Sequence, residues 1–116
     1  MFAGTVPEAT TTFIHRDYHP GNTLWSDGKL TGIVDWTAAS VGAPALDIAH
    51  MRLNLARDIG LDAADEFAAH HRRIAGQTFE HQPYWDVVDA ADALPELDPT
   101  ELPAIERYLA AALARL

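Results

Sequence analysis

The sequence predicts a small α+β protein that is mainly helical, with one β-hairpin followed by about four helices. Two observations predict this fold class. Two extended segments are joined by Asp27-Gly28-Lys29, and Asp-Gly between such segments is a strong hairpin signal. After them, apolar residues recur at helical spacing in four segments that Gly, Pro and Asp separate. With 116 residues and no internal repeat, the chain is expected to form a single domain over residues 1–116.

The extended segments all lie in the first third of the chain. A β-branched and aromatic segment, Thr10–Ile14, predicts a short strand. The hairpin strands are predicted over Asn22–Ser26 and Leu30–Asp35, on either side of the Asp-Gly turn. Because a two-stranded hairpin alone is only marginally stable in water, we expect it to lie on an apolar surface. Residues 37–44 are small and polar and are expected to form a connecting loop.

Four helices are expected in the remainder. Their predicted spans are Ala45–Ile59, Ala63–Ala75, Pro83 to about Leu94, and the segment from Asp98 to the C-terminus. The first has a wide apolar stripe that reaches Ile59, which predicts a largely buried helix. The second is expected to begin at a capping Asp62 and to bury a face that includes Ile74. Asp98-Pro99-Thr100-Glu101 has the pattern of a capping box and predicts the start of the fourth.

Composition and charge argue against several classes of function. The net charge is −9 and the basic residues are scattered, whereas nucleic-acid-binding proteins cluster Lys and Arg. The absence of cysteine excludes disulfides and thiolate metal sites, and favours a cytoplasmic location. No apolar run approaches the roughly 20 residues of a membrane helix, so no membrane partner is expected. Trp25, Trp36 and Trp85 are expected to fill the core, although Trp36 follows an acid and would help to shape a site there.

The most informative stretch is His15-Arg16-Asp17-Tyr18-His19-Pro20-Gly21-Asn22, which has the spacing H-x-D-x-x-x-x-N. A second acid, Asp35, ends an apolar run further along the chain. Phosphoryl transfer needs a carboxylate near the attacking hydroxyl and hard oxygen ligands for Mg²⁺. Asp17 has the chemistry for the first role, and Asn22 and Asp35 have the chemistry for the second. Because the hairpin begins at Asn22 and ends at Asp35, its folding should bring these two ligands together near Asp17.

Two other interpretations of these residues stay open. Asp and Asn favour turns, so all three would also fit simple turn positions. His15, Asp17 and His19 alternate, and on an extended strand they would share one face, as metal ligands do. That pattern indicates a metallohydrolase as a rival class of enzyme. Pro20-Gly21 argues against it, because this pair breaks the strand at once.

With these motifs, the chain resembles the C-terminal lobe of the aminoglycoside phosphotransferase family, relatives of the protein kinases. The His15–Asn22 stretch matches the family's catalytic loop, although many relatives have Gly where Arg16 stands. Ile33-Val34-Asp35-Trp36 matches the segment that replaces the Asp-Phe-Gly of kinases, and Gly42-Ala43-Pro44-Ala45-Leu46-Asp47-Ile48-Ala49 resembles the stretch that follows it. The resemblance implies a protein-kinase-like C-terminal lobe over nearly the whole chain.

The resemblance also implies an ATP-dependent O-phosphotransferase that acts on a small-molecule hydroxyl. Asp17 would orient and deprotonate that hydroxyl, and His15 would help to orient the loop. Asn22 and Asp35 would hold Mg²⁺ against the phosphates of ATP, and Asp47 would brace the catalytic loop. A cationic acceptor would suit a group of acids at positions where relatives often contact such acceptors, although a solvated helix face is the favoured explanation: Asp86, Asp89, Asp92, Glu96 and Asp98.

One departure from the family bears on activity. The family's ATP lobe supplies a nucleotide-clamping loop and a phosphate-binding lysine before the catalytic loop. Here 14 residues precede His15, the one lysine is Lys29 in the hairpin turn, and no glycine-rich loop occurs. We therefore expect a truncated or split phosphotransferase with little activity alone. The alternative is a non-catalytic remnant that serves as an interaction or oligomerisation module. Helices without their usual partners would expose apolar surface, so we expect a homodimer or higher oligomer.

Overall fold

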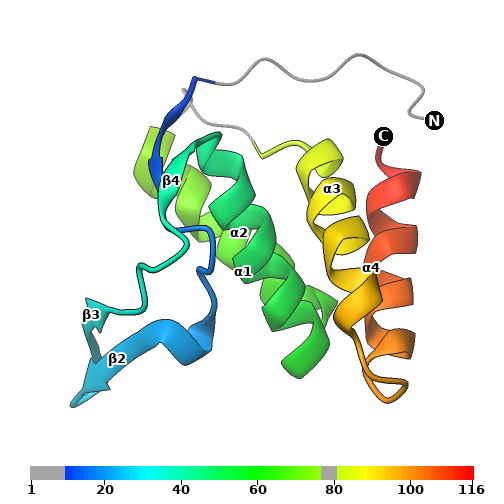
Figure 1. The fold of residues 1–116 in the computed structure, drawn as a ribbon, viewed down its shortest axis with the longest axis horizontal. Coiled ribbons are helices and arrows are strands. Elements are labelled where there is room, and N and C mark those ends of the chain that lie inside the picture. The colour runs from blue at the N-terminus through cyan, green and yellow to red at the C-terminus, as the bar shows by residue number, and fades with distance from the viewer. Residues whose placement is uncertain (1–9, 77–80) are drawn as a thin grey trace.

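The computed structural model describes residues 10–76 and 81–116, and it confirms the predicted hairpin and four helices in those residues. The strands are β1 (Thr12–Ile14), β2 (Thr23–Ser26), β3 (Lys29–Ile33) and β4 (Ser40–Gly42). The α-helices are α1 (Pro44–Asp58), α2 (Leu61–Ala75), α3 (Pro83–Ala93) and α4 (Leu102–Ala114). Two short 3₁₀ helices, η1 (Pro20–Asn22) and η3 (Leu94–Glu96), complete the described elements. The strands lie on one side of the helical part, across α1 from α3 and α4 (Figure 1).

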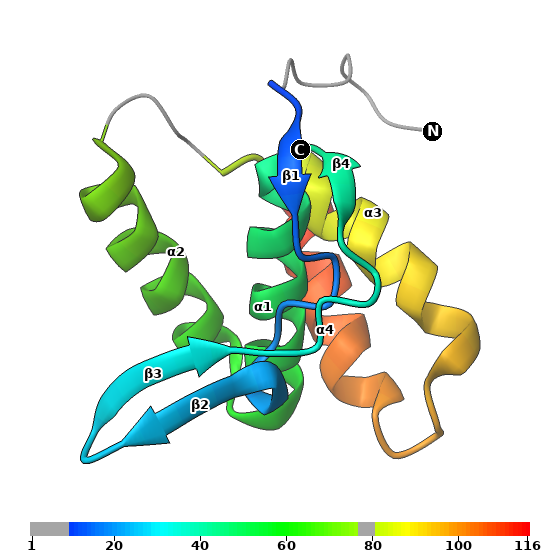
Figure 2. The ribbon, with the colours of Figure 1, turned by 60° about the vertical axis from the view of Figure 1, so that its left-hand side comes forward.

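The hairpin forms as the Asp-Gly signal predicts. β2 and β3 are antiparallel, with Thr23 opposite Ile33 and a register irregularity after Leu24. Asp27 and Gly28 both have positive φ, 51° and 76°, which is the backbone of a type I′ turn. The expectation that the hairpin lies on an apolar surface is wrong, because it projects from the helices and most of its residues are exposed (Figure 2).

A second two-stranded sheet joins β1, which the sequence predicts as a strand, to β4, which lies where the sequence predicts only a loop. β4 pairs with β1 in antiparallel register, with Phe13 opposite Val41. Three residues of mixed character carry no strand signal of their own, so β4 depends on this pairing. The Arg16 side chain secures it further, because its guanidinium donates to the Ser40 hydroxyl and, over 3.0 Å, to the Val41 carbonyl. This small sheet anchors the chain directly before the catalytic-loop motif.

The helices pack around α1, which contacts α2, α3 and α4 (Figures 1 and 2). Their shared core combines small and large side chains from all four helices, namely Leu53, Ala56, Ala64, Ala90, Ile105 and Tyr108. Alanine at the contacts lets the helix backbones approach closely, and the larger side chains fill the remaining space. Tyr108 is almost fully buried, and burial raises the pKa of its hydroxyl well above the ordinary value.

Three helix boundaries differ from the prediction. Pro44 starts α1 one residue early, at a position where its missing N–H costs nothing. Gly60, with φ of 151°, occupies the N-cap of α2, so Asp62 lies in the first turn and does not cap it. The capping-box bonds around Asp98 do form, but α4 begins only at Leu102. Pro103 explains the delay, because it has no N–H to donate to the carbonyl four residues earlier.

Several apolar side chains expected in the core are instead exposed. Ile59, at the C-cap of α1, is 74% exposed, and Ile74, in the last turn of α2, is 89% exposed. Trp25 and Trp36 are 62% and 47% exposed, so they do not fill the core as expected. Trp36 still contributes packing, because its ring lies 4.5 Å from that of His15, centroid to centroid. Within the described ranges, no helix is long and apolar enough to span a membrane.

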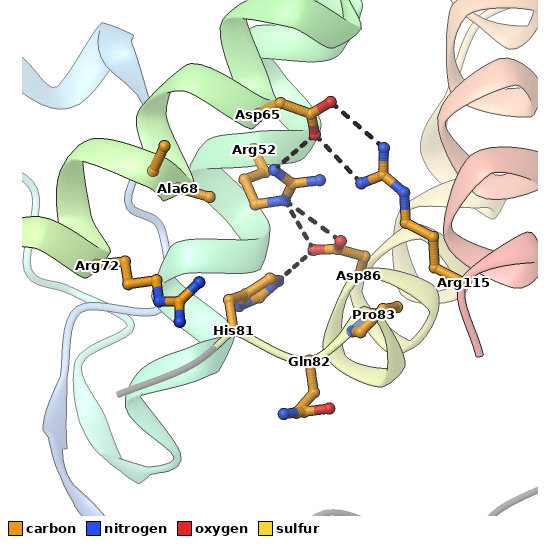
Figure 3. Close-up of a pocket in the computed structure, with 10 residues that line it drawn as sticks. Arg52, Asp65, Ala68, Arg72, His81, Gln82, Pro83, Asp86 and Arg115 are labelled. Atoms are coloured by element: carbon orange, nitrogen blue, oxygen red, sulfur yellow. Dashed lines mark hydrogen bonds and ion pairs between the residues drawn. The ribbon is translucent and has the colours of Figure 1, made fainter. Parts of the chain in front are cut away.

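A network of ion pairs joins the helices beside a cavity of about 400 Å³ (Figure 3). The buried Arg52 side chain of α1 donates to both oxygens of the buried Asp86 carboxylate, each over 3.3 Å. His81 contacts the same carboxylate over 2.6 Å, and Asp65 of α2 bridges Arg52 and Arg115. Because these bonds run between elements, they fix the position of α3 against α1.

Candidate active site

The catalytic-loop motif follows β1 directly and is held by His15. This buried ring accepts a hydrogen bond from the Asp17 backbone N–H at Nδ1 over 3.1 Å. Its Nε2 lies 2.8 Å from the Val34 carbonyl oxygen, which can only accept. Together the two bonds fix the neutral tautomer with the proton on Nε2. His15 therefore ties the loop that carries Asp17 to the segment that leads to Asp35.

Asp47, in the first turn of α1, binds the same loop from behind. Its two carboxylate oxygens accept hydrogen bonds from consecutive backbone N–H groups, those of His15 over 2.9 Å and Arg16 over 2.8 Å. Arg16 has φ of 72°, in the left-handed region that favours Gly. Here the bonds from Arg16 to Asp47 and to β4 offset the strain, on the order of 1–2 kcal/mol, of a non-glycine residue.

Asp17 and Asn22 meet directly. The Asn22 amide nitrogen donates to the Asp17 backbone carbonyl over 2.9 Å and to the Asp17 carboxylate over 3.2 Å. Because these bonds use the NH₂ group of a buried Asn22 side chain, its amide oxygen stays available as a hard ligand for a cation. The Asp17 carboxylate is 41% exposed, so a substrate hydroxyl can approach it from solvent.

Asp35 reaches the same region through its backbone. The N–H of the preceding residue, Val34, donates to the Asn22 carbonyl over 2.9 Å, and Asp35 itself has φ of 59°. Its carboxylate is exposed and accepts a hydrogen bond from the Thr37 hydroxyl over 2.8 Å. In the described part of the chain, this carboxylate makes no hydrogen bond to Asp17 or Asn22. The structure therefore joins Asp17 and Asn22 by side chains, and Asp35 to them by neighbouring backbone.

Two histidines that the sequence interpretation did not assign to the site lie against Asp17. His19 and His50 each place Nε2 near the same Asp17 oxygen, at 3.5 and 3.4 Å. His19 accepts the Gly21 N–H at Nδ1, which makes it a neutral Nε2–H tautomer like that of His15. His50 instead has its Nδ1 3.1 Å from Asp89 of α3.

His50 is the one histidine of the three whose ring nitrogens both face carboxylates. Burial disfavours its charged form, but the hydrogen bond and charge of Asp89, together with the charge of Asp17, outweigh burial and raise the pKa of His50 above its ordinary value. A neutral imidazole can donate from one nitrogen only, and its other nitrogen would then face an acceptor. The geometry therefore favours imidazolium at this position.

The sequence contains a pattern that indicates His50 as a site residue, although the sequence interpretation did not use it. His50 follows Asp47 by three residues, so the two lie on one polar face of α1, which continues to Asn54. Two of the α3 acids are likewise not on a solvated face. Asp86 is buried against Arg52, and Asp89 pairs with His50, so these two are already neutralised by cations of this chain.

An apolar cavity of about 560 Å³ lies on the other side of the loop. His15, Tyr18 and Asp47 line it, together with Trp36 and apolar residues of β1 and α2. Burial, and secondarily the charge of Asp47, raise the pKa of the Tyr18 hydroxyl above its ordinary value. Neither Asp17 nor Asn22 lines this cavity, which separates it from the candidate acid–base group.

The rival metallohydrolase lacks a ligand set in the described residues. No group of three or more His, Asp or Glu side chains there is arranged to hold a metal ion. His15 has both ring nitrogens occupied by backbone groups, and His19 has one, so the alternating histidines are used in holding the loop. Mg²⁺ makes a different demand, because one or two protein oxygens together with phosphate and water ligands suffice. Asn22 and Asp35 meet that demand chemically.

Comparison with known proteins gives one result. The family model described as the phosphotransferase enzyme family matches residues 1–86, about three quarters of the chain. That match contains the catalytic loop, the hairpin, α1 and α2, and it ends inside α3. Searches of curated proteins and of solved structures returned no significant match.

Proposed function

The chain belongs to the phosphotransferase enzyme family, and we propose that it carries the acid–base and metal-binding part of a site that phosphorylates a small-molecule hydroxyl. The observation that carries this proposal is the direct contact of Asp17 with Asn22 in a loop that His15 and Asp47 hold from two sides. A loop fixed in this way keeps a carboxylate and an amide oxygen in a constant relation, which catalysis by positioning requires.

Each residue has a defined task in this proposal. Asp17 orients the acceptor hydroxyl and accepts its proton, a contribution of about 10²–10⁴ in rate for a general base. Asn22 and Asp35 would hold Mg²⁺, which supplies charge neutralisation for the phosphate groups. His15 and Asp47 keep the loop in place and do not touch substrate. The acceptor is a small-molecule hydroxyl, and a cationic one is expected from the acids that stay exposed, Asp92, Glu96 and Asp98.

The described residues offer oxygen ligands for Mg²⁺, but they do not place a cationic side chain where it would bind the triphosphate of ATP. Lys29 lies at the exposed hairpin turn, and Arg16 is engaged by β4, so neither is placed to hold a triphosphate beside Asn22. Binding of the nucleotide therefore needs contacts beyond those described. We propose that the isolated chain has little turnover for this reason, and that ATP and Mg²⁺ are the cofactors of the complete site.

The test is turnover and binding by the purified chain with Mg²⁺, ATP and a panel of aminoglycosides and simpler alcohols. We expect slow, Mg²⁺-dependent ADP release that falls about 100-fold in Asp17→Asn. Calorimetry should show weak Mg²⁺–nucleotide binding that Asp35→Ala and Asn22→Ala weaken further. Glu106→Gln is a matched control, because it removes one exposed acid of α4 to which the proposal gives no role.

Four outcomes separate the candidate functions. Turnover that Asp17→Asn leaves unchanged would show that another group is the base. Rapid turnover would refute the proposal that phosphate contacts are missing. Absence of both turnover and Mg²⁺–nucleotide binding would favour the non-catalytic remnant, a module for interaction or oligomerisation. Tight Zn²⁺ binding without nucleotide binding would favour the rival interpretation, a metallohydrolase.

A further inference from the structure

We propose that His50 is a positioning residue, which links the Asp17 carboxylate of the catalytic loop to Asp89 on α3 and does so in its charged form. This inference rests on the proposed function, because it concerns the group assigned there as the base. It concerns α1 and α3, which lie outside the catalytic-loop motif.

The geometry of the link is specific. His50 Nδ1 lies 3.1 and 3.3 Å from the two Asp89 oxygens, and Nε2 lies 3.4 Å from Asp17 Oδ1. Asn22 donates to the other oxygen of Asp17, Oδ2. The carboxylate is thus held at both oxygens, by Asn22 and His19 from within the loop and by His50 from the helices. Two points of attachment fix the direction of a carboxylate, whereas one leaves it free to rotate.

The charge state of His50 follows from what surrounds it. The titratable groups that the described residues place against it are Asp17 of the loop, His19 before η1 and Asp89 of α3. The His19 ring lies 6.0 Å away, centroid to centroid, and its Nδ1 accepts the Gly21 N–H. Both ring nitrogens of His50 therefore face carboxylates, and its protonation completes both contacts.

A consequence for pH dependence follows. Below its pKa, His50 donates to both carboxylates and holds Asp17. As the pH rises through that pKa, His50 loses one of its two N–H donors. The contact with Asp17 is longer and less buried than that with Asp89, so we expect it to be the one that is lost. The base then loses its attachment to the helices. We therefore expect the site to lose activity on the alkaline side.

The test is an NMR titration of the His50 imidazole in the full chain and in two single variants, Asp17→Asn and Asp89→Asn. Each variant removes one anion from His50 while keeping the size of the side chain. We expect both to lower the pKa of His50, Asp89→Asn by more because its contact is shorter and its carboxylate less exposed. His70→Gln, which removes an exposed histidine of α2, should leave the titration of His50 unchanged.

A lowered pKa in Asp89→Asn together with an unchanged pKa in Asp17→Asn would overturn the inference, because His50 would then pair with α3 alone. Asp17→Asn changes a half-exposed loop side chain, so we expect the variant to fold. The same spectra check that it does. The titration needs no turnover and decides the inference by itself. Failure of the proposed function is a separate result: the chain would show no activity, although Asp17→Asn still lowers the pKa of His50.

A second readout applies to whatever turnover the chain shows. His50→Gln keeps a hydrogen-bond donor but cannot become a cation. We expect it to lower kcat about 10- to 100-fold at pH 7, to leave the KM of the acceptor nearly unchanged, and to abolish the alkaline fall of the kcat profile. An unchanged kcat profile in His50→Gln would contradict a positioning role, since a merely structural histidine would not set its alkaline limb.

Discussion

Removal of the Asp47 carboxylate should destabilise the protein by releasing the catalytic loop from α1. Asp47 accepts two hydrogen bonds from consecutive backbone N–H groups, those of His15 and Arg16, over 2.9 and 2.8 Å. A hydrogen bond to a charged group contributes about 1.5–3 kcal/mol. The bond from His15 is partly buried and takes the middle of that range, whereas the exposed bond from Arg16 contributes less. Asp47→Ala should therefore cost about 3 kcal/mol.

Asp47→Asn provides a graded version of the same change. The amide keeps one oxygen, so it can accept from one N–H, while its NH₂ group faces the other N–H. We expect a loss of about 2 kcal/mol in the free energy of unfolding, smaller than that of Asp47→Ala. The assay is urea unfolding followed by far-ultraviolet circular dichroism, with an unchanged slope in urea concentration as the sign of a preserved native state.

Amide hydrogen exchange locates the loss in the structure. In both variants, the N–H groups of His15 and Arg16 should exchange faster, while those in the middle of α1 keep their protection to the extent that global stability allows. Asp92→Asn is the control, because this exposed acid of α3 should change stability by less than about 0.5 kcal/mol. If both Asp47 variants match that control, the carboxylate does not hold the loop and the bracing role is refuted.

Three further predictions concern the helices and the surface. Asp86→Ala leaves buried Arg52 without its buried carboxylate partner, with Asp65 as its remaining ion pair, and should cost about 3 kcal/mol in urea unfolding, whereas Asp58→Ala, at an exposed pair, should cost less than about 1 kcal/mol. The folded-state pKa of His50 lies above its ordinary value of 6.5, so its contribution to stability is complete below about pH 6.5 and is lost as pH rises through the folded-state pKa. Urea midpoints at pH 6 and pH 9 should show this fall, and His50→Gln should lack it. Sedimentation velocity should show concentration-dependent association that Ile74→Ser weakens, because this 89% exposed side chain lies beside the apolar cavity; a strictly monomeric profile would contradict it.

The sequence predicts those parts of the fold that depend on local signals. Asp27-Gly28 sets the hairpin because both residues can adopt positive φ. The helices follow from apolar spacing, and their errors are local too, since Pro103 postpones the start of α4. β4 could not be predicted, because its three residues become a strand only through pairing with β1 on the other side of the hairpin. The exposed Trp25 could not be predicted either, because spacing does not reveal which faces lack a partner.

The candidate site divides in the same way. Asp17 and Asn22 are five residues apart, and their contact is a property of the loop itself. Asp47 was expected from the family pattern, and its position in the first turn of α1 places its carboxylate against two loop N–H groups. The contact of His50 with Asp89 joins residues 39 apart in sequence and exists only because α3 packs on α1. No local pattern contains that information.

One face of α1 therefore holds the catalytic loop at two levels. Asp47 binds the loop backbone, and His50, three residues further on, contacts the side chain of the proposed base. The second contact is also tied to α3, whose position depends on the buried bond between Arg52 and Asp86. A weakened Arg52–Asp86 pair should then act on Asp17 at a distance, by shifting Asp89 and with it His50. The buried Arg52–Asp86 pair is therefore expected to help to determine the geometry of the site.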